Sequence, residues 1–482
     1  MKKLVAFGLA LIFLGSFGLL YSFGIISGVH QGAVAALGLY PVSVKTPEEK
    51  IGPFLKEKIE KAEKGEKIPV VVSLTAEPGG LAVAQQMNVI PQLTATGLQI
   101  TGRTTLASNT VFGTISAERV KELASNSYVS EVLYDGMFFR LSSDAGIAAN
   151  VGQIGAPNAW AKGYKGQGVV VIVIDSGIQN NHPWLMRGGK SLVLKEYHVC
   201  SNADYTHWHG THVAGIVASQ DSTYKGVAPG IKGFIDIVTF NSNGQATLSW
   251  VLKALDIAYT EAENFKDQGV PVVSTNSWGG PSADNPVINK VRYAAMKLAD
   301  LIPVVFAAGN YRPSSGTITS PGDADKENNE IITVGAVDSS NNIACFSSRG
   351  PDSWGNEHNE PDVVAPGVNV ISSVPGGHRP ASGTSMATPH VAGTVALMLS
   401  KNSNIGNMQS LEILESTAKD LGAGGFDYAY GYGIIQAGKA VDAVPGPSPI
   451  PIPNAIQALS IIGIALGSVL VLREERKIPV GG

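Results

Sequence analysis

The chain has 482 residues, which allows about two to four domains, and it combines 44% hydrophobic with only 15% charged residues. Its formal net charge of −4 and its lack of a dense Lys/Arg stripe exclude an electrostatic nucleic-acid surface. The two cysteines, Cys200 and Cys345, form no CxxC pair, which excludes a thiol redox motif and a cysteine-rich zinc site. The sequence leaves open whether they pair as a disulfide or stay separate thiols.

The N-terminal 35 residues have the pattern of an export signal. Lys2 and Lys3 are followed by a stretch from Leu4 to Val29 that carries no charge. A basic start and an apolar run are typical of signal peptides, and Ala33-Val34-Ala35 offers an A-x-A cleavage site. The run is longer than an ordinary signal core. Residues 1–35 are therefore predicted to be either a signal peptide or an uncleaved N-terminal anchor.

Residues 45–141 are predicted to form a small α/β module. The first 20 or so residues are charged and helix-prone, and the β-branched run from Ile68 to Leu74 predicts a strand. Further along, a strand, a helix and a second strand are expected over 110–116, 117–123 and 129–134. Two strand–helix units of this size could form a binding domain alone, and their meaning depends on the rest of the chain.

From Gly152 onward the pattern changes to that of a layered α/β domain. The runs 169–174, 304–306 and 331–334 are continuously apolar, as expected of parallel strands that are buried on both faces. Helical stretches such as 249–266 and 289–301 separate them, which predicts a mainly parallel sheet between helices. In such folds the active site lies beyond the carboxyl ends of the strands.

An acid and a histidine cluster lie on the segments where this fold places its chemistry. Asp175 directly follows the first apolar run, although an acid at a strand end is by itself more often a cap. The string over 207–212 contains His207, His209 and His212, which suggests a zinc hydrolase as an alternative. No glutamate lies among them and the HExxH spacing is absent, which argues against zinc.

Ser385 lies at the start of a strongly apolar helix. Pro389 is tolerated only near a helix start, so Ser385 stands at or just before the N-terminus of a helix that extends to Leu399. Backbone N–H groups are unpaired there and the helix dipole favours negative charge. The ordinary alternative is an N-cap serine with no chemical role.

The C-terminus is predicted to anchor the chain in a membrane. A proline-rich linker over 445–454 precedes 18 uncharged residues over 455–472. At 1.5 Å per residue these span about 27 Å, close to the bilayer core of about 30 Å. Arg473, Arg476 and Lys477 favour a cytoplasmic tail over 473–482, which leaves the rest outside. The arrangement also resembles tails that sortase-like enzymes remove, a minor alternative.

Several strings in a fixed order point to one family. Asp-Ser-Gly at 175–177, His-Gly-Thr-His-Val-Ala-Gly at 209–215 and Gly-Thr-Ser-Met-Ala-Thr-Pro-His at 383–390 resemble those of the subtilisin-like serine proteases, the subtilases. The strings Ala-Ala-Gly-Asn at 307–310 and Pro-Asp-Val-Val-Ala-Pro-Gly at 361–367 fit the same family. The resemblance implies a three-layer subtilisin-like α/β fold with a mainly parallel central sheet over residues 142–444.

The resemblance also implies the roles of the site residues. Ser385 is expected to be the nucleophile, His209 its general base and later acid, and Asp175 the carboxylate that holds the imidazole tautomer. Asn310 is expected to donate its amide to the oxyanion, beside the Ser385 backbone N–H. The expected activity is that of a serine-type endopeptidase that hydrolyses peptide bonds through an acyl-enzyme and requires no cofactor.

The substrate pocket of the family maps onto the segment Ser277, Trp278, Gly279 and Gly280 and onto Gly309. The glycines predict room for a large side chain, and no aspartate marks a preference for basic residues. A broad, apolar-leaning specificity is therefore expected.

The usual calcium site of the family is not supported by this sequence. Trp184 stands where many subtilases carry an acidic ligand, and the loop that supplies the others is missing near residues 220–230. Calcium takes about six to eight oxygen ligands. An acidic loop formed by Asp323, Asp325, Glu327 and Glu330 leaves a different calcium site open, although a solvated loop is the simpler interpretation.

The resemblance gives the module over 45–141 a meaning as a ferredoxin-like propeptide that inhibits the enzyme and templates its folding. Its tail near 138–141 is then expected in the active site, with self-cleavage between about residues 138 and 150.

Together these expectations describe an exported, self-processing endopeptidase on the outer face of the cell membrane, or one that is secreted after loss of its tail. Its expected partners are protein or peptide substrates and its own propeptide. The rival from another class is a catalytically inactive surface binding protein on the same fold, because a fold alone does not establish activity.

Overall fold

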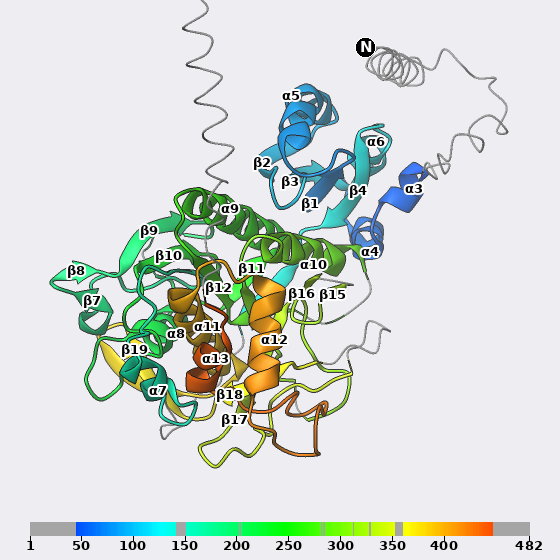
Figure 1. Cartoon of the computed structure of the whole chain (residues 1–482). Helices are drawn as coiled ribbons and strands as arrows, with labels where there is room; N and C mark the ends of the chain where they lie inside the picture. The colour runs from blue at the N-terminus through cyan, green and yellow to red at the C-terminus, as the bar shows by residue number, and fades with distance from the viewer. Residues whose placement is uncertain are drawn as a thin grey trace, which may run out of the picture. The chain divides into compact units, whose positions relative to one another are not determined.

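The computed structural model, drawn in Figure 1, describes residues 45–140, 151–201, 203, 205–280, 282, 285–311, 313–326, 329–351 and 360–446. The chain divides into a unit of residues 1–49 and a unit that begins at Lys50, and the fold below belongs to the second. The predicted signal segment, transmembrane segment and cytoplasmic tail, with all of the linker beyond residue 446, lie outside the described residues.

The second unit begins with a four-stranded antiparallel sheet in the order β2-β3-β1-β4. Its elements are α4 (Pro53–Lys61), β1 (Lys67–Leu74), α5 (Gly80–Ala95), β2 (Gln99–Thr104), β3 (Thr110–Ser116), η1 (Ala117–Arg119), α6 (Val120–Ala124) and β4 (Val129–Tyr134), and the short α3 (Pro47–Lys50) precedes them. The strands and α5 and α6 follow the β-α-β-β-α-β order of a ferredoxin-like module.

The two faces of this small sheet are buried in different cores. Val70 and Val72 of β1 belong to a cluster that includes Leu93 of α5. Val71 between them belongs to another cluster, which includes Val251 of α9 (Leu248–Asp267). Because alternate residues of a strand point to opposite faces, the valine run of β1 supplies apolar surface to both sides.

A seven-stranded parallel sheet with the order β18-β17-β14-β12-β6-β10-β9 forms the centre of the larger domain. Every residue of its six strands other than β9 is buried, which explains their continuously apolar sequences. The strands are β6 (Val170–Asp175), β9 (Val193–His198), β10 (Gly233–Val238), β12 (Val272–Asn276), β14 (Val304–Ala307), β17 (Ile332–Val337) and β18 (Val363–Pro366).

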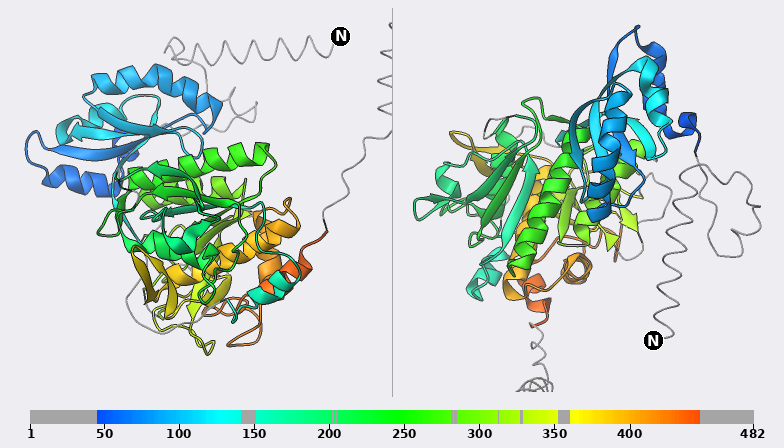
Figure 2. Two further views of the ribbon diagram at one scale, coloured as in Figure 1. Left: turned by 90° about the vertical axis from the view of Figure 1, so that its left-hand side faces the viewer. Right: turned by 90° about the horizontal axis from the view of Figure 1, so that it is seen from above.

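Helices cover both faces of this sheet, as the two views of Figure 2 show. Val171 and Val173 of β6 share a core with α8 (Trp208–Ala218) and the almost wholly buried α11 (Thr384–Lys401). Ile172 and Ile174 share the opposite core with α9 and α10 (Pro286–Ala299). The domain therefore has three layers, helix, sheet and helix.

Shorter elements complete the described fold. They are β5 (Met137–Arg140), α7 (Ala156–Ala161), η2 (Pro183–Leu185), β7 (Met186–Arg187), β8 (Lys190–Ser191), β11 (Gln245–Thr247), β13 (Trp278–Gly279), β15 (Asp325–Lys326), β16 (Asn329–Glu330), β19 (Val370–Val374), β20 (Gly377–Ala381), α12 (Asn407–Thr417) and α13 (Ala437–Ala443).

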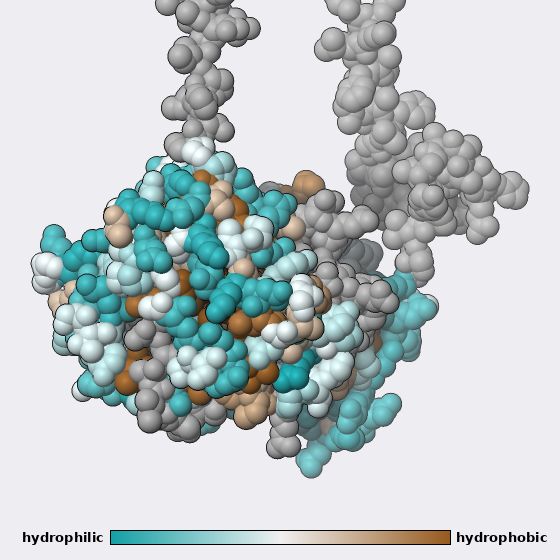
Figure 3. Space-filling view, turned by 60° about the horizontal axis from the view of Figure 1, so that its bottom comes forward, coloured by the Kyte–Doolittle hydropathy of each residue, from teal (hydrophilic) through white to brown (hydrophobic). Residues whose placement is uncertain are grey.

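The predicted fold class, an α/β domain built on a mainly parallel sheet, is confirmed. The predicted domain boundaries stay predictions. Cys200 and Cys345 are both free thiols, and burial raises the pKa of Cys200 to about 11. Across the described part of the chain, no helix is both long and apolar enough to cross a membrane. Hydrophilic residues dominate the face seen in Figure 3, where hydrophobic ones are scattered.

Candidate active site

The fold brings the predicted reactive side chains to the ends of neighbouring elements. Asp175 is the last residue of β6, and His209 and Ser385 are each the second residue of their helices, α8 and α11. Asn310 lies in the loop that follows β14. These positions agree with the rule that sites on parallel sheets lie beyond the carboxyl ends of the strands.

Asp175 and His209 form a buried hydrogen-bonded pair. His209 Nδ1 lies 2.8 Å from Asp175 Oδ1 and 3.0 Å from Oδ2. The Ser176 backbone N–H and hydroxyl also donate to Asp175 Oδ1, at 2.7 and 3.1 Å. Burial raises the pKa of Asp175, but the opposing effect of His209 and the Ser176 donors is larger. The pKa of Asp175 is therefore below its ordinary value.

This pairing fixes which nitrogen of the imidazole is basic. An ionised carboxylate accepts hydrogen bonds only, so it holds the proton on His209 Nδ1 and leaves Nε2 as the acceptor. His209 Nε2 is buried and makes no hydrogen bond with any described group. Leaving a buried acceptor without a donor costs free energy, so such atoms are rare in folded proteins. A nitrogen of this kind is suited to accept a proton from a hydroxyl group.

The Ser385 hydroxyl points to a backbone carbonyl in this structure. Its Oγ donates to the Ser277 carbonyl at 3.0 Å, while Ser277 Oγ donates to the Ser385 carbonyl at 2.9 Å. This reciprocal pair fastens the start of α11 to the residue before β13.

Hydrogen bonds to its oxygen orient the side-chain amide of Asn310. Its Oδ1 accepts hydrogen bonds from both the Thr384 backbone N–H and the Thr384 hydroxyl, each at 3.0 Å. Since both Thr384 donors contact Oδ1, the orientation of the amide is fixed. The oxygen faces Thr384, and the N–H groups of Nδ2 lie on the other side of the amide. Ser385, next in the chain, lies in the first turn of α11, where backbone N–H groups lack intrahelical acceptors.

A strand at the end of the small module lies next to the segment that follows Ser277. β5 lies between β11 and β13 in a three-stranded antiparallel sheet. Phe139 pairs with both Gln245 and Gly279, and Arg140 pairs with Trp278. A peptide held between two short strands in this way is bound through its backbone, as in strand addition.

The predicted pocket residues have more than one kind of role. Ser277 contacts Ser385 as described, and Trp278 presents its backbone to β5 while its buried ring packs between Phe240 and Phe306. The Trp278 side chain is thus part of the core. Gly280 is joined by two backbone hydrogen bonds to Ser320, at 2.8 and 3.1 Å.

The space beside the two remaining pocket glycines is filled by Thr319. A Cβ atom added at Gly279 would lie 2.6 Å from Thr319 Oγ1, and one added at Gly309 would overlap Thr319 Cγ2. Gly309 also has a φ of +115°, which side chains rarely adopt. The absence of a Cβ atom at Gly279 and Gly309 therefore leaves room for the Thr319 side chain, which packs closely against both glycines.

The histidine cluster is not arranged to hold a metal. His207 Nδ1 accepts from the His209 backbone N–H at 3.3 Å, and His212 Nε2 donates to the Arg379 carbonyl at 3.1 Å. Burial lowers the pKa of His212 to about 3. Among the described residues, no three or more His, Cys, Asp or Glu side chains gather as metal ligands do.

The positions considered for calcium have other partners. Trp184 forms an aromatic cluster with His378 and Tyr224, whose ring centroids lie 5.1 and 5.5 Å from its own and 5.5 Å from each other. Asp323 is buried and paired with the buried Arg292, whose Nε lies 2.9 Å from Oδ1. The solvated-loop interpretation is therefore wrong for Asp323, because an ion pair with Arg292 accounts for its burial.

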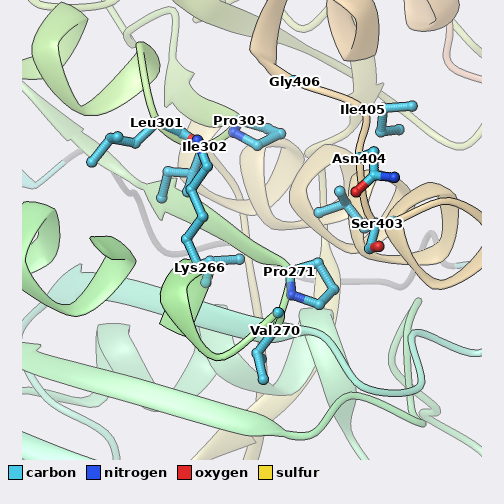
Figure 4. A pocket seen from close by; sticks show the side chains of 13 residues that line it. Lys266, Val270, Pro271, Leu301, Ile302, Pro303, Ser403, Asn404, Ile405 and Gly406 are labelled. Carbon is cyan, nitrogen blue, oxygen red and sulfur yellow. The ribbon is translucent and has the colours of Figure 1, made fainter. Parts of the chain in front are cut away.

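A cavity of about 250 Å³ lies away from the site (Figure 4). It is lined by Pro271 and Pro303, which precede β12 and β14, and by residues such as Lys266 and Asn404. It therefore lies at the amino ends of these strands and contains none of the predicted site residues.

Comparison with known proteins gives one consistent result. Residues 166–433 match the model of the family described as Subtilase family. The chain is 37% identical over 336 residues to subtilisin E of Bacillus subtilis (strain 168), covering 69% of this chain and 80% of that protein. It is 39% identical over 294 residues to the subtilisin of Bacillus pumilus, covering 60% and 97%, respectively. It is also 32% identical over 293 residues to alkaline elastase YaB of Bacillus sp. (strain YaB), covering 60% and 69%.

Proposed function

Because the chain belongs to the subtilase family and is a serine-type endopeptidase of the subtilisin type, we propose that it is an exported, self-processing enzyme whose catalytic triad is Asp175, His209 and Ser385. The observation that carries the proposal is the buried pair of Asp175 and His209, with Nε2 left without a hydrogen bond. A fluorophosphonate probe tests it: Ser385 should be labelled, and absence of labelling would favour an inactive binding protein.

Catalysis then proceeds by proton transfer within the triad. The Ser385 hydroxyl leaves the Ser277 carbonyl and gives its proton to His209 Nε2 as Oγ attacks the substrate carbonyl. Asp175 stays ionised and stabilises the imidazolium through Nδ1. His209 next protonates the leaving amine, and water hydrolyses the acyl-enzyme by the same route in reverse.

Two donors are proposed for the oxyanion that forms during attack. They are the Asn310 amide, oriented by its hydrogen bonds from Thr384, and the Ser385 backbone N–H at the start of α11. Their positions are set before the substrate binds, so stabilising the developing charge requires little reorganisation. The helix dipole adds to this effect.

This chemistry uses protein groups alone, and we propose that no cofactor is required. A chelator should leave kcat unchanged while Ser385→Ala abolishes activity. The zinc hydrolase alternative predicts the opposite pair of results.

We propose that the module over 45–141 is the inhibitory propeptide. The support is the position of β5 between β11 and β13, together with carboxylates on both sides of the contact. Asp135 accepts from the Ser249 backbone N–H at 2.6 Å, at the start of α9. Asp256 of α9 accepts from the Leu106 and Ala107 backbone N–H groups at 2.8 and 2.9 Å. Hydrogen bonds to charged groups are each worth about 1.5–3 kcal/mol.

The register of β5 favours one bond within the predicted cleavage window. Pairing of Phe139 with Gly279 and of Arg140 with Trp278 means that the next residue of a bound substrate faces Ser277. Ser277 is hydrogen-bonded to Ser385, so the carbonyl of that next residue is the one to be attacked. In the chain's own sequence it is Leu141, and we propose cleavage between Leu141 and Ser142.

Mass mapping of the purified protein tests self-processing. The expected mature N-terminus is Ser142, and Ser385→Ala should yield a chain that keeps residues 45–141. Normal processing in Ser385→Ala would contradict self-cleavage. A mature terminus outside 138–150 would contradict the register argument.

We further propose that the pocket for the residue before the cut takes apolar side chains of small to medium size. Thr319 closes the space that Gly279 and Gly309 leave, and the pocket segment contains no acid to attract a basic residue. Peptides with Ala, Leu, Phe and Lys at that position should rank Leu first. A clear preference for Lys would contradict this assignment.

The predicted C-terminal anchor over 455–472 also enters as a proposal, supported by the uncharged sequence and the basic residues that follow. The full chain should sediment with membranes and be accessible from outside. A variant that ends at residue 454 should appear in the medium. Retention of that shorter variant in the membrane fraction would contradict a C-terminal anchor.

A further inference from the structure

The loop that carries Asn310 is held by hydrogen bonds at each of three consecutive residues. The Gly309 backbone N–H donates to Thr384 Oγ1 at 3.2 Å, and the Gly309 carbonyl accepts from the Ser348 backbone N–H at 2.9 Å. The Asn310 side chain accepts two hydrogen bonds from Thr384, as described above. The Tyr311 backbone N–H donates to Ser348 Oγ at 3.2 Å. Thr384 and Ser348 therefore hold the backbone both before and after Asn310.

Ser348 is fully buried, and the residues on both sides of it are fastened to other parts of the fold. Ser347 Oγ accepts from the Ala336 backbone N–H of β17 at 3.1 Å. The Arg349 carbonyl accepts from the Thr317 backbone N–H at 3.0 Å, and Thr317 Oγ1 accepts from the Arg349 backbone N–H at the same distance. Because its neighbours are fixed in this way, the Ser348 hydroxyl offers the loop a rigid acceptor.

The Ser348 side chain also packs directly against the loop. A Cβ atom added at Gly309 would lie 2.8 Å from Ser348 Oγ, so the backbone approaches this hydroxyl more closely than a side chain would allow. Gly309 is buried, Asn310 is half-buried and Tyr311 is 48% exposed. The chain thus passes from the core to the surface within three residues, and the hydrogen bond from Tyr311 to Ser348 fastens its exposed end.

We propose that Ser348 is a positioning residue for the oxyanion donor Asn310. The inference rests on the proposed function, in which the Asn310 amide stabilises the oxyanion. Ser348 acts through its hydrogen bonds with Gly309 and Tyr311, which set the backbone that carries the amide. An oxyanion donor must lie within about 2.7–3.1 Å of the developing charge, and a misplacement of about 1 Å costs about 10²-fold in rate. Loss of the Ser348 hydroxyl should therefore weaken transition-state binding although the amide is still present.

A double-mutant cycle tests this role. The mature enzyme is assayed with one peptide anilide, and kcat is calculated per active site, counted by fluorophosphonate labelling run to completion. Ser348→Ala should lower kcat about tenfold and leave KM nearly unchanged, a smaller loss than the factor of about 10²–10³ expected for Asn310→Ala. When Asn310→Ala is already present, adding Ser348→Ala should lower kcat by less than about twofold, because the donor that Ser348 positions is then missing.

Ser347→Ala is the matched control. Ser347 is also buried and its Oγ accepts one backbone N–H, but this N–H belongs to Ala336 of β17 and not to the loop that carries Asn310. Both serine variants should lower the urea midpoint of the labelled enzyme by a similar amount, while only Ser348→Ala lowers kcat. Ser348→Cys keeps a weak acceptor, so its kcat should lie between those of wild type and Ser348→Ala. It also serves as the second variant if Ser348→Ala does not fold.

The outcomes separate this role of Ser348 from the proposed function. An unchanged kcat in Asn310→Ala would contradict the proposed oxyanion donor itself. If Asn310→Ala does lower kcat, the role of Ser348 alone is overturned by an unchanged kcat in Ser348→Ala. It is also overturned if Ser348→Ala causes the same loss of kcat with and without Asn310→Ala. A loss in Ser347→Ala as large as that in Ser348→Ala would overturn it too, because the effect would then be one of general packing.

Discussion

Replacing Thr319 with glycine should widen the pocket for the residue before the cut. The Thr319 side chain occupies the space next to Gly279 and Gly309, and its removal takes away three heavy atoms. Each buried methylene-sized group contributes about 0.8 kcal/mol to binding, or about fourfold. Two to three such groups give a selectivity change of about 15- to 60-fold, within the range of about 10- to 200-fold known for single methylenes in apolar pockets.

The assay compares kcat/KM for two peptide anilides that differ only in Phe or Ala before the cut. The Phe to Ala ratio should rise by the calculated factor in Thr319→Gly and by a smaller factor in Thr319→Ser, which keeps Oγ1. Thr319 Oγ1 lies 3.2 Å from the Ala307 and Ala308 carbonyls, so Thr319→Gly should also cost about 1–2 kcal/mol of unfolding free energy. An unchanged or lower ratio in a folded, labelled enzyme would refute the assignment of Thr319 to the pocket.

Further outcomes follow from the same contacts. Asn310→Ala should lower kcat by about 10²–10³, the loss found for the oxyanion asparagine of a subtilisin, while leaving KM nearly unchanged. Asp175→Asn should lower kcat by about 10⁴ in steady-state assays at neutral pH, since it removes the acceptor that fixes the His209 tautomer. Asp323→Asn should destabilise the enzyme by about 3–5 kcal/mol in urea unfolding, because the buried Arg292 loses its charge partner; a change below 1 kcal/mol would contradict this. Burial and the nearby Glu412 raise the pKa of Glu415 from 4.5 to about 7, so the neutral form is favoured on folding and that stability is lost as pH rises through this range. Glu415→Gln, measured in the inhibited enzyme, should therefore gain about 1 kcal/mol over wild type at pH 8 after solvent screening, and less at pH 4.

Local sequence was sufficient for three of the seven strands of the large sheet and for part of the small one. The apolar runs that became β6, β14 and β17 are buried on both faces, so no polar residue interrupts them. Helix α5 was not predicted, because it begins at Gly80 and contains Pro91, and both residue types oppose helix formation. Tertiary packing of residues such as Val89 and Leu93 against the small sheet outweighs these local preferences.

The candidate site also contains some residues that local sequence identifies and others that only tertiary packing brings into place. Asp175, His209 and Ser385 stand in short strings that carry their own signature, so the sequence singled them out and the fold sets Asp175 against His209. Thr319 lies in a string without such a signature. Its contact with Gly279 arises only through long-range packing, which no local pattern reports.

The shortness of β11 and β13 has a consequence for the mature enzyme. On our proposal that β5 leaves after self-cleavage, both strands would then be open sheet edges, and exposed edges invite pairing with other chains and aggregation. β11 has three residues and β13 only two, so neither presents a ladder long enough to template a growing sheet. Together, β11 and β13 can still bind one extended peptide through backbone pairing on both of its sides. The proposed cleft would then bind an extended peptide through its backbone, while strands this short give folded copies of the enzyme little edge to pair with.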